Sequence, residues 1–362
     1  MEKTMVNVGI IGCGGIANGK HMPSLQKVEN CQMTAFCDLI AERAEEAAAV
    51  YGTPEAAVYT DYRELLKDPT IDVVHVCTPN RSHSEITVAA LEAGKHVMCE
   101  KPMAINSAEA KKMLDAAKKS GKLLTIGYQN RFRADSLYMK AEAEAGVFGK
   151  IYYAKATALR RRAVPTWGVF LNEYEQGGGS LIDIGTHSLD LTLWMMDNYK
   201  PKYCVGTVYH KLNRDTEQGN AWGSWNPDDF TVEDSAFGFI VMENGATIVL
   251  ESSWALNTLD VREAVTSVCG TKAGADMNKG LRINGIHNGR QYVTSPSFDA
   301  GGAAFNEGHA GESAADMEAR LWIEAVRGGA APITKPEQAY CVTRILEGIY
   351  ESAKTGKPYY FS

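Results

Sequence analysis

Asp183 and His187 are four residues apart in LIDIGTHSLDL, a segment expected to be helical. Side chains at positions i and i+4 of a helix project from the same face, so the two should lie side by side. A histidine exchanges protons near neutral pH, which suits it to acid–base chemistry. The pair is also compatible with a structural hydrogen bond, and Asp190 shares its face one turn further on.

Lys101 is a second candidate for chemistry, in the sequence Cys99-Glu100-Lys101-Pro102. The apolar run His96–Cys99 predicts a short strand, which places Lys101 at the carboxyl end of that strand. An ammonium group there can hydrogen-bond a hydroxyl and stabilise negative charge as it develops on the oxygen. The alternative is a surface lysine that precedes a proline.

The elements that would position these groups begin with Val6–Ala17, VNVGIIGCGGIA. A β-branched apolar run leads directly into a glycine-rich turn, which predicts a buried strand followed by a helix. Glycines let the backbone approach a pyrophosphate, which would bind at the helix N-terminus. The residues expected to line this site are Gly12, Gly14, Gly15 and Ile16.

Asp38 ends the next predicted strand, Cys31–Asp38, at about the 20-residue distance typical of a ribose-binding acid. A carboxylate there accepts hydrogen bonds from the ribose 2′-hydroxyl and repels a 2′-phosphate, which favours NAD over NADP. Leu39 follows at a position where NADP enzymes often carry a basic residue, and Arg43 is a further cofactor candidate one turn later. Asp38 is equally suited to cap the helix predicted for Ala41–Tyr51.

Strands and helices alternate through the first part of the chain, which predicts a doubly wound parallel sheet. Strands are expected at Tyr59–Tyr62, Val73–Cys77, His96–Cys99 and Leu123–Gly127. Ligands of such sheets bind outside the carboxyl ends of the strands. The polar cofactor candidates at these ends are Thr78, Asn80, His83, Glu100, Lys101 and Gln129.

Beyond about Asn130 the strands follow one another, which predicts an α+β domain with a large, mainly antiparallel sheet. They are expected at Lys150–Arg160, Tyr203–His210, Ser235–Met242, Ala246–Trp254, Ala264–Cys269 and Leu281–Asn284. Helices are expected at Asp183–Met195, Glu312–Val326 and Pro336–Ala353. We therefore predict a cofactor domain at 1–128 and a substrate domain at 129–362, with the C-terminal helix able to pack back on the first domain.

Composition restricts the class of partner. The 362 residues carry a formal charge of −7, which argues against nucleic acid or an anionic membrane and favours a small-molecule substrate. The eight cysteines are scattered without a C-x-x-C pair, so we expect reduced thiols and no metal site. No apolar run reaches the roughly 18 residues that span a bilayer. The first strand begins almost at once, leaving no room for a signal peptide, so we expect a cytoplasmic protein.

Four segments together resemble the Gfo/Idh/MocA family of sugar and cyclitol oxidoreductases, and the resemblance extends over essentially the whole chain. They are GIIGCGGIA (9–17), CTPN (77–80), CEKP (99–102) and GGGSLIDIGTHSLDL (177–191). The resemblance implies an NAD-binding Rossmann domain, then an α+β domain whose open sheet assembles dimers or tetramers. It implies that Lys101 is the catalytic lysine, that His187 is the acid–base histidine, and that Asp183 binds substrate or orients the other two.

The segment after the first strand of the second domain resembles a branch of the family that acts on pyranoses and glycosides. Trp167 could stack on a sugar ring and Arg161 could reach hydroxyls, although solvated arginines and a packing tryptophan are an equal alternative. Tyr128 and Arg131 are weaker substrate candidates.

Three functions remain open at this stage. The first is NAD-dependent oxidation of a ring hydroxyl, expected at C3, of a sugar or glycoside. The second is glycoside cleavage through transient C3 oxidation, elimination and return of the hydride. The third is a non-catalytic NAD-binding regulator, which is disfavoured because all three catalytic candidates are present.

Overall fold

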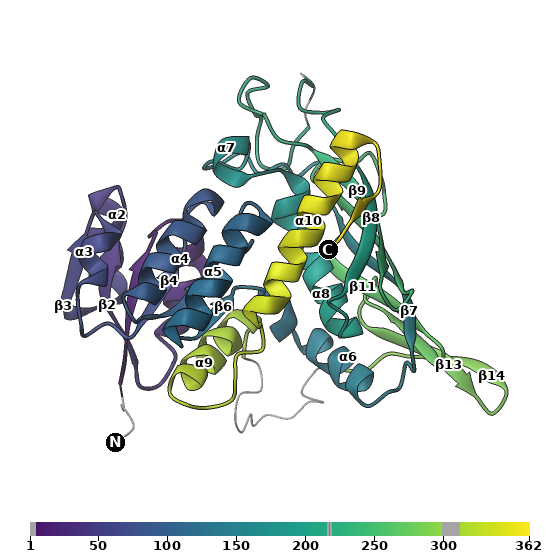
Figure 1. The fold of residues 1–362 in the computed structure, drawn as a ribbon, viewed down its shortest axis with the longest axis horizontal. Coiled ribbons are helices and arrows are strands. Elements are labelled where there is room, and N and C mark those ends of the chain that lie inside the picture. Colours follow the sequence, from purple (N-terminus) through teal and green to yellow (C-terminus); the bar gives the residue numbers. More distant parts are fainter. Residues whose placement is uncertain (1–4, 216, 218, 299–311) are drawn as a thin grey trace. The chain divides into compact units, whose positions relative to one another are not determined.

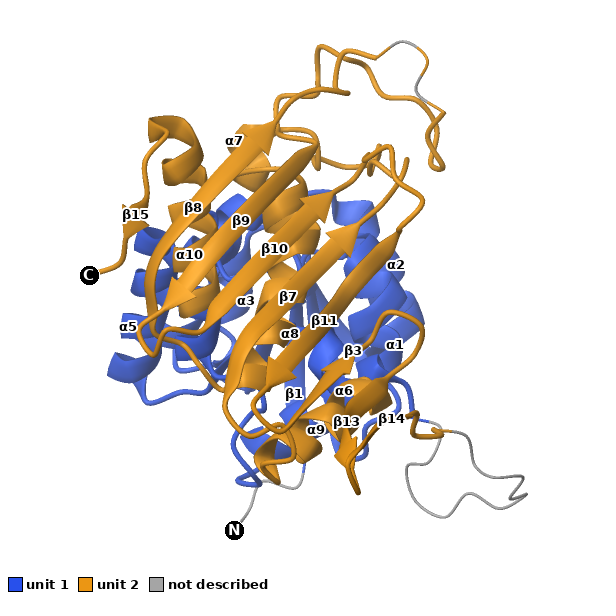
Figure 2. Ribbon diagram, turned by 90° about the vertical axis from the view of Figure 1, so that its right-hand side faces the viewer, with its two compact units in different colours: residues 1–132, 309–340 blue, residues 133–308, 341–362 orange. Residues whose placement is uncertain are grey.

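The computed structural model describes residues 5–298 except 216 and 218, and residues 312–362 (Figure 1). The chain forms two compact units, one of residues 1–132 and 309–340, the other of residues 133–308 and 341–362 (Figure 2). Helix α9 (Ala314–Val326), which we had assigned to the second domain, packs against α1 (Met22–Leu25) within unit 1. Helix α10 (Pro336–Thr355) begins in unit 1 and continues in unit 2.

Unit 1 is built on a six-stranded parallel sheet in the order β3-β2-β1-β4-β5-β6, which confirms the Rossmann prediction. Its strands are β1 (Val6–Ile11), β2 (Cys31–Cys37), β3 (Gly52–Tyr59), β4 (Val73–Val76), β5 (His96–Cys99) and β6 (Leu124–Ile126). The helices that follow them are α2 (Ala41–Tyr51), α3 (Tyr62–Leu66), α4 (His83–Glu92) and α5 (Ser107–Ser120). Short turns are η1 (Ala17–His21), η2 (Asn80–Ser82) and η3 (Gln129–Phe132).

The local sequence explains most of these boundaries. Four of the six residues of β1 are apolar and almost fully buried, as expected for a strand covered on both faces. Helix α5 begins at Asn106, whose side chain accepts the N–H of Glu109, and ends at Gly121 in the left-handed conformation. The strand expected at Tyr59–Tyr62 was misplaced, because β3 lies earlier, at Gly52–Tyr59. Its Pro54 is tolerated because β3 is the edge strand of the sheet.

Unit 2 is built on a nine-stranded sheet in the order β14-β13-β12-β11-β7-β10-β9-β8-β15. Every neighbouring pair is antiparallel except β10 and β7, which confirms the expected mainly antiparallel sheet. The strands are β7 (Ile151–Leu159), β8 (Pro201–Tyr209), β9 (Ser235–Met242), β10 (Thr247–Ser253), β11 (Arg262–Gly270), β12 (Ala273–Asp276), β13 (Arg282–His287), β14 (Arg290–Thr294) and β15 (Tyr359–Tyr360). A hairpin at Asn244-Gly245 joins β9 to β10, with Gly245 at φ 85°, as is typical of this dipeptide between two strands.

The helices of unit 2 cover one face of this sheet. They are α6 (Ala134–Glu144), α7 (Glu173–Gln176), the turn η4 (Leu181–Gly185), α8 (Thr186–Met196) and most of α10. Helix α8 packs on β7 and β11, while Figure 2 shows no helix of this unit over the face turned toward the viewer. The sheet therefore has one buried face and one open face.

Candidate active site

The glycine turn after β1, which we call the glycine cradle, is packed against the protein at Gly12 and open at Gly14 and Gly15. Gly12 has a φ of 90°, and a Cβ atom there would lie 2.6 Å from the carbonyl oxygen of Cys77, so only glycine fits. Added Cβ atoms at Gly14 and Gly15 would meet nothing within 4 Å, and Ile16 is 42% exposed. The backbone at Gly14 and Gly15 is thus open to a pyrophosphate, as the predicted site requires.

Asp38 stands at the end of β2, beside this turn. One carboxylate oxygen accepts the Cys13 N–H at 2.8 Å, and the other accepts the Ile40 N–H at 3.0 Å. The carboxylate therefore braces both the glycine turn and the start of α2, which is close to the capping role considered above. Its position also suits the predicted ribose contact, and Arg43 is exposed in the first turn of α2.

Glu100 is the hub of a buried polar network that the sequence did not reveal. Its Oε1 accepts hydrogen bonds from Lys20 Nζ and His21 Nε2, each at 2.8 Å, and Oε2 accepts the Lys101 backbone N–H at 3.0 Å. Lys20 also pairs with Glu318 of α9 at 2.8 Å. We expected Glu100 to bind cofactor, but the residue is 5% exposed and its side chain bonds to the Lys101 N–H and to Lys20 and His21 of η1.

Charges in this network are mutually compensating. Burial alone would raise the pKa of Glu100, but Lys20 and His21 hold that pKa well below its usual range. Burial would lower the pKa of Lys20, but Glu100 and Glu318 raise it. His75 Nδ1 lies 3.0 Å from His21 Nδ1, and burial, together with His21 and Lys20, holds the pKa of His75 well below its usual value. His75 is therefore neutral at pH 7.

His83 connects two of the strand-end turns. It is fully buried, and its ring nitrogens lie 2.8 Å from the carbonyl oxygens of Thr78 and Pro102. Burial lowers its pKa. His83 is thus buried between the turns that follow β4 and β5, and both of its ring nitrogens lie against backbone carbonyls of these turns. Thr78, whose hydroxyl accepts a hydrogen bond from Ser82, stays a cofactor candidate, as does Asn80 at 9% exposed.

The residues after β6 differ in their accessibility. Gln129 is half-buried and remains a cofactor candidate. Arg131 is completely buried and donates hydrogen bonds to the Ile333 carbonyl at 3.2 Å and to Gln338 at 2.6 Å. Tyr128 is 1% exposed. These positions argue against the direct substrate contacts that we predicted for Tyr128 and Arg131.

In unit 2, Asp183 and His187 stand out by their exposure. Every other residue from Leu181 to Met195 is buried, including Asp190, whereas these two side chains are half-buried. Asp183 lies in η4, a π-helical turn, and His187 is the second residue of the regular helix α8. Such π turns occur frequently at functional sites. An otherwise buried helix thus presents one carboxylate and one imidazole, four residues apart.

Glu233, which sequence reasoning missed, holds the start of this helix. Its carboxylate accepts the N–H groups of Gly179 at 2.7 Å and Leu181 at 2.9 Å, and the Tyr350 hydroxyl at 2.9 Å. Burial raises the pKa of Glu233 despite these donors. Cβ atoms would collide with the Tyr350 hydroxyl at Gly178 and with the Glu233 carbonyl at Gly179, which explains the glycine run.

The arginine–tryptophan segment after β7 forms an exposed aromatic cluster. Trp167 is 52% exposed, and its ring contacts Trp222 and Phe170 edge-on, with centroids 5.0 and 5.8 Å apart. Arg160 stacks over Trp222 and pairs with Glu263. Arg161 is exposed. Trp167 and Arg161 are thus accessible, so they remain candidates for substrate contact.

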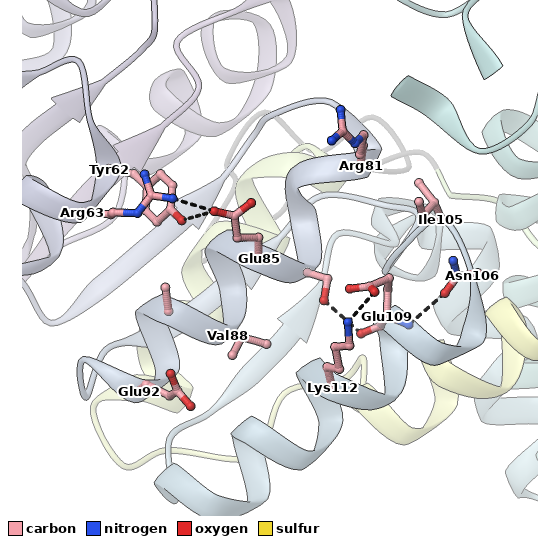
Figure 3. A pocket seen from close by; sticks show the side chains of 12 residues that line it. Tyr62, Arg63, Arg81, Glu85, Val88, Glu92, Ile105, Asn106, Glu109 and Lys112 are labelled. Carbon is pink, nitrogen blue, oxygen red and sulfur yellow. Dashed lines mark hydrogen bonds and ion pairs between the residues drawn. The ribbon is translucent and has the colours of Figure 1, made fainter. Parts of the chain in front are cut away.

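A surface hollow between α3, α4 and α5 is separate from all of these groups (Figure 3). No predicted site residue lines it, and four of its charged residues form two ion pairs, Arg63 with Glu85 and Lys112 with Glu109. In the part of the chain that the structure describes, no group of three or more His, Cys, Asp or Glu could hold a metal ion. None of the helices described is long and apolar enough to cross a membrane.

Comparison with known proteins identifies related chains. Residues 6–128 match the model of the Gfo/Idh/MocA oxidoreductase family with an NAD-binding Rossmann fold, and residues 140–361 match the model of its C-terminal α/β domain. The D-glucoside 3-dehydrogenase of Escherichia coli K12 is 37% identical over 356 residues, 98% of this chain and 97% of the relative. A myo-inositol 2-dehydrogenase of Thermotoga maritima is 31% identical over 53% of this chain and 55% of its own length.

Solved structures share the fold at lower identity. A levoglucosan dehydrogenase in complex with NADH superposes with a TM-score of 0.80 at 22% identity, covering 99% of both chains. An aldose-aldose oxidoreductase from Caulobacter crescentus, complexed with glycerol, gives a TM-score of 0.78 at 24% identity over 99% of this chain and 100% of the other. These structures establish a common architecture for the two units.

Proposed function

Because this chain belongs to the Gfo/Idh/MocA family of NAD-dependent oxidoreductases, we propose that it oxidises the C3 hydroxyl of a glucoside. The observation that carries the proposal is the pair Asp183 and His187, presented by an otherwise buried helix. The Escherichia coli relative, which matches over 97% of its length, is named a D-glucoside 3-dehydrogenase, which favours this substrate and this carbon.

The cofactor site is proposed at the carboxyl ends of β1, β2, β4 and β5. The exposed backbone of Gly14 and Gly15 would bind the pyrophosphate, and the Asp38 carboxylate would accept a hydrogen bond from the ribose hydroxyl. When bound, NAD supplies the acceptor for a hydride from carbon. Residues 1–128 therefore form the proposed cofactor domain, extended in the structure by α9.

The protein must handle the hydroxyl proton. In the proposed mechanism the Lys101 ammonium hydrogen-bonds the reacting oxygen and stabilises its developing negative charge. His187 accepts the proton as the C–H bond breaks and the carbonyl forms. Asp183 binds a neighbouring hydroxyl and fixes the substrate against His187.

The experiment is incubation of the purified protein with NAD and a panel of methyl and aryl glucosides. We expect NADH absorbance to rise and mass spectrometry to find a product lacking two hydrogens. Lys101→Ala should lower turnover by about a thousandfold, since it removes the charge that stabilises the oxyanion, while NAD still binds in a fluorescence titration. A fully active Lys101→Ala would contradict the mechanism.

The redox-neutral cleavage considered above is not favoured, since the full-length relative is named a dehydrogenase. The same panel tests this point, because cleavage would release the aryl group without net NADH. A regulator without catalysis would give neither product.

The open face of the sheet in unit 2 is the basis for proposing a homo-oligomer. This face carries an ion pair between Lys155 of β7 and Glu251 of β10, and beside it a set of apolar side chains that are at least partly exposed: Tyr203 and Val205 of β8, Phe237, Phe239 and Val241 of β9, Val249 of β10 and Val265 of β11. We call this set the outer face. An exposed apolar sheet face of this kind marks an association surface, here with a second copy in a dimer or tetramer.

A cytoplasmic location is also part of the proposal. Six of the eight free cysteines are buried. Burial raises the pKa of several, among them Cys31 and Cys204, each to about 12. Protonated, buried thiols of this kind suit a reducing compartment.

A further inference from the structure

Trp254 follows directly after β10 and reaches the carboxylate of Asp183. Its indole Nε1–H donates a hydrogen bond to Asp183 Oδ2 at 3.0 Å. The tryptophan itself is completely buried, whereas Asp183 is half-buried. A buried indole N–H needs an acceptor, and a charged acceptor makes the bond stronger than a neutral one. The two residues are 71 positions apart in the chain, so sequence spacing could not reveal the contact.

The position of Trp254 is fixed independently of Asp183. Its backbone N–H donates to the Asp234 carbonyl at 3.0 Å, and its carbonyl accepts the Ala163 N–H at 2.9 Å. Its ring belongs to a core cluster that includes Ile184 and Phe230. Ile184 is the immediate neighbour of Asp183 in η4. The indole is therefore a rigid donor built into the same core as the turn that carries the carboxylate.

We propose that Trp254 is a positioning residue for the reaction, because it holds one oxygen of Asp183 and so sets the plane of the carboxylate. The proposal rests on the proposed function of Asp183 in substrate binding. A carboxylate can turn about its side-chain torsions, and a fixed donor removes much of that freedom before the substrate arrives. Glu233 fixes the backbone at the start of the same turn. Backbone and side chain are thus held by separate residues.

The chain contains a matched control for this role. Trp225 is 5% exposed and lies in the same core cluster, and its indole donates to the carbonyl of Asn213 at 2.9 Å. Phe230 contacts both rings, with centroids 5.7 Å from Trp225 and 6.2 Å from Trp254. A Trp→Phe change removes the same atoms at either site, the indole N–H among them, and leaves a single six-membered aromatic ring. The two variants differ in the acceptor that loses its donor.

The experiment compares Trp254→Phe and Trp225→Phe in the full-length protein with NAD and the best glucoside of the panel. We expect a similar decrease in the thermal unfolding midpoint for both. For Trp254→Phe alone, kcat/KM for the glucoside should fall by about 10- to 100-fold, mainly through KM, as a misplaced substrate-binding group requires. The dissociation constant for NADH, measured by fluorescence, should stay within about twofold, because the indole of Trp254 bonds to Asp183, which is proposed to bind the substrate and not the cofactor.

The outcomes separate this inference from the proposed function. Equal kcat/KM values in the two variants would overturn the role of Trp254 while the wild-type activity still stands. The role of Trp254 would also be overturned if kcat/KM decreased in both variants only in proportion to the fraction of protein that is no longer folded. If the Asp183→Ala variant oxidises the glucoside as fast as the wild type does, the proposed role of Asp183 is wrong, whatever the result for Trp254→Phe.

Discussion

The buried carboxylate of Glu100 joins two turns of unit 1, the turn η1 after the glycine cradle and the turn after β5. Lys20 and His21 come from the turn after the glycine cradle, while the Lys101 N–H belongs to the turn after β5. A buried charge is tolerated only when it is paired and hydrogen-bonded, and here both oxygens have donors. Because Oε1 accepts from His21 Nε2, the hydrogen of His21 must be on that nitrogen when the ring is neutral. His21 Nδ1 then accepts a hydrogen bond from His75 Nδ1.

The neutral state of His75 leads to a pH prediction. Its folded pKa lies well below the unfolded value of about 6.5, so below that pH the unfolded state binds a proton that the folded state does not. The free energy of unfolding should therefore fall with decreasing pH, by up to about 1.4 kcal/mol per pH unit for this group. Urea unfolding between pH 7.5 and 5.5 measures the slope.

His75→Gln should reduce that slope by this one proton, since glutamine can still donate to His21 but does not titrate. His287→Gln is the control, because His287 is exposed on β13 and its replacement should leave the slope unchanged. A His75→Gln slope equal to that of the wild type would show that another group carries the dependence. His83 and His96, whose pKa values burial also lowers, would then be the next residues to test.

For individual residues, the sequence predicted which side chains belong to a candidate site better than it predicted their hydrogen-bond partners. Glycine spacing led to the cradle at Gly14 and Gly15, and helix periodicity led to Asp183 and His187. The burial of Arg131 and the contacts of Glu100 could not be predicted, because their partners Ile333 and Lys20 come from distant segments of the chain. Buried polar networks are set by tertiary packing, which leaves no periodic signal in the sequence.

Among the elements, η1 and η4 share a feature. Each is a π-helical turn at the start of a helix, one after the glycine cradle and the other carrying Asp183. The sequence predicted a helix at both places but not the wider turn. The helix that carries Asp183 follows a GGGS run, and the structure explains its glycines: Glu233 and Tyr350 approach the backbone too closely for any side chain at Gly178 or Gly179.

Glu233→Gln should loosen the start of the helix that carries Asp183. An amide has one oxygen where the carboxylate has two, so an N–H of Gly179 or Leu181 would face another donor. We expect a loss of about 1–3 kcal/mol in the free energy of unfolding and faster hydrogen exchange in residues 179–183. Tyr350→Phe removes a donor to Glu233 and the hydroxyl's hydrogen bonds with the backbone of Gly179 and Ile182, but leaves both carboxylate oxygens in place. It should cost about 1 kcal/mol and speed that exchange less than Glu233→Gln does. Equal exchange in both variants would contradict the anchoring role of the carboxylate.

For the molecule as a whole, the order of strands and helices predicted both fold types. It did not predict every strand of the large sheet or the limits of the two units. Short or polar strands such as β12 and β14 carry little hydrophobic signal, and all five residues of β14 are exposed. Helix α9 was assigned to the wrong unit, because sequence order does not indicate that a late segment returns to the first sheet domain. Strand alternation nevertheless defines both faces of the large sheet.

That alternation supports the last prediction, which concerns assembly. In β9 and β10 the buried residues Ile240, Ile248 and Leu250 alternate with Phe239 and Val249 of the outer face. Antiparallel sheets with one solvated face normally carry polar side chains there, so the apolar outer face indicates a covering partner. Phe239 is 45% exposed and is paired with Val249 and Val205 on its two neighbouring strands. A charge at its position would be buried without a partner in a symmetric contact.

Phe239→Lys should therefore convert the wild-type oligomer into a monomer in sedimentation velocity experiments at micromolar concentration, with the fold retained by circular dichroism. Val50→Lys is the matched control, because Val50 is an exposed apolar residue on α2 of unit 1 and is not part of the outer face. It should leave the sedimentation coefficient unchanged. A wild-type protein that sediments as a monomer would show that the outer face remains open to solvent. A Phe239→Lys variant that still associates would show that another surface mediates assembly.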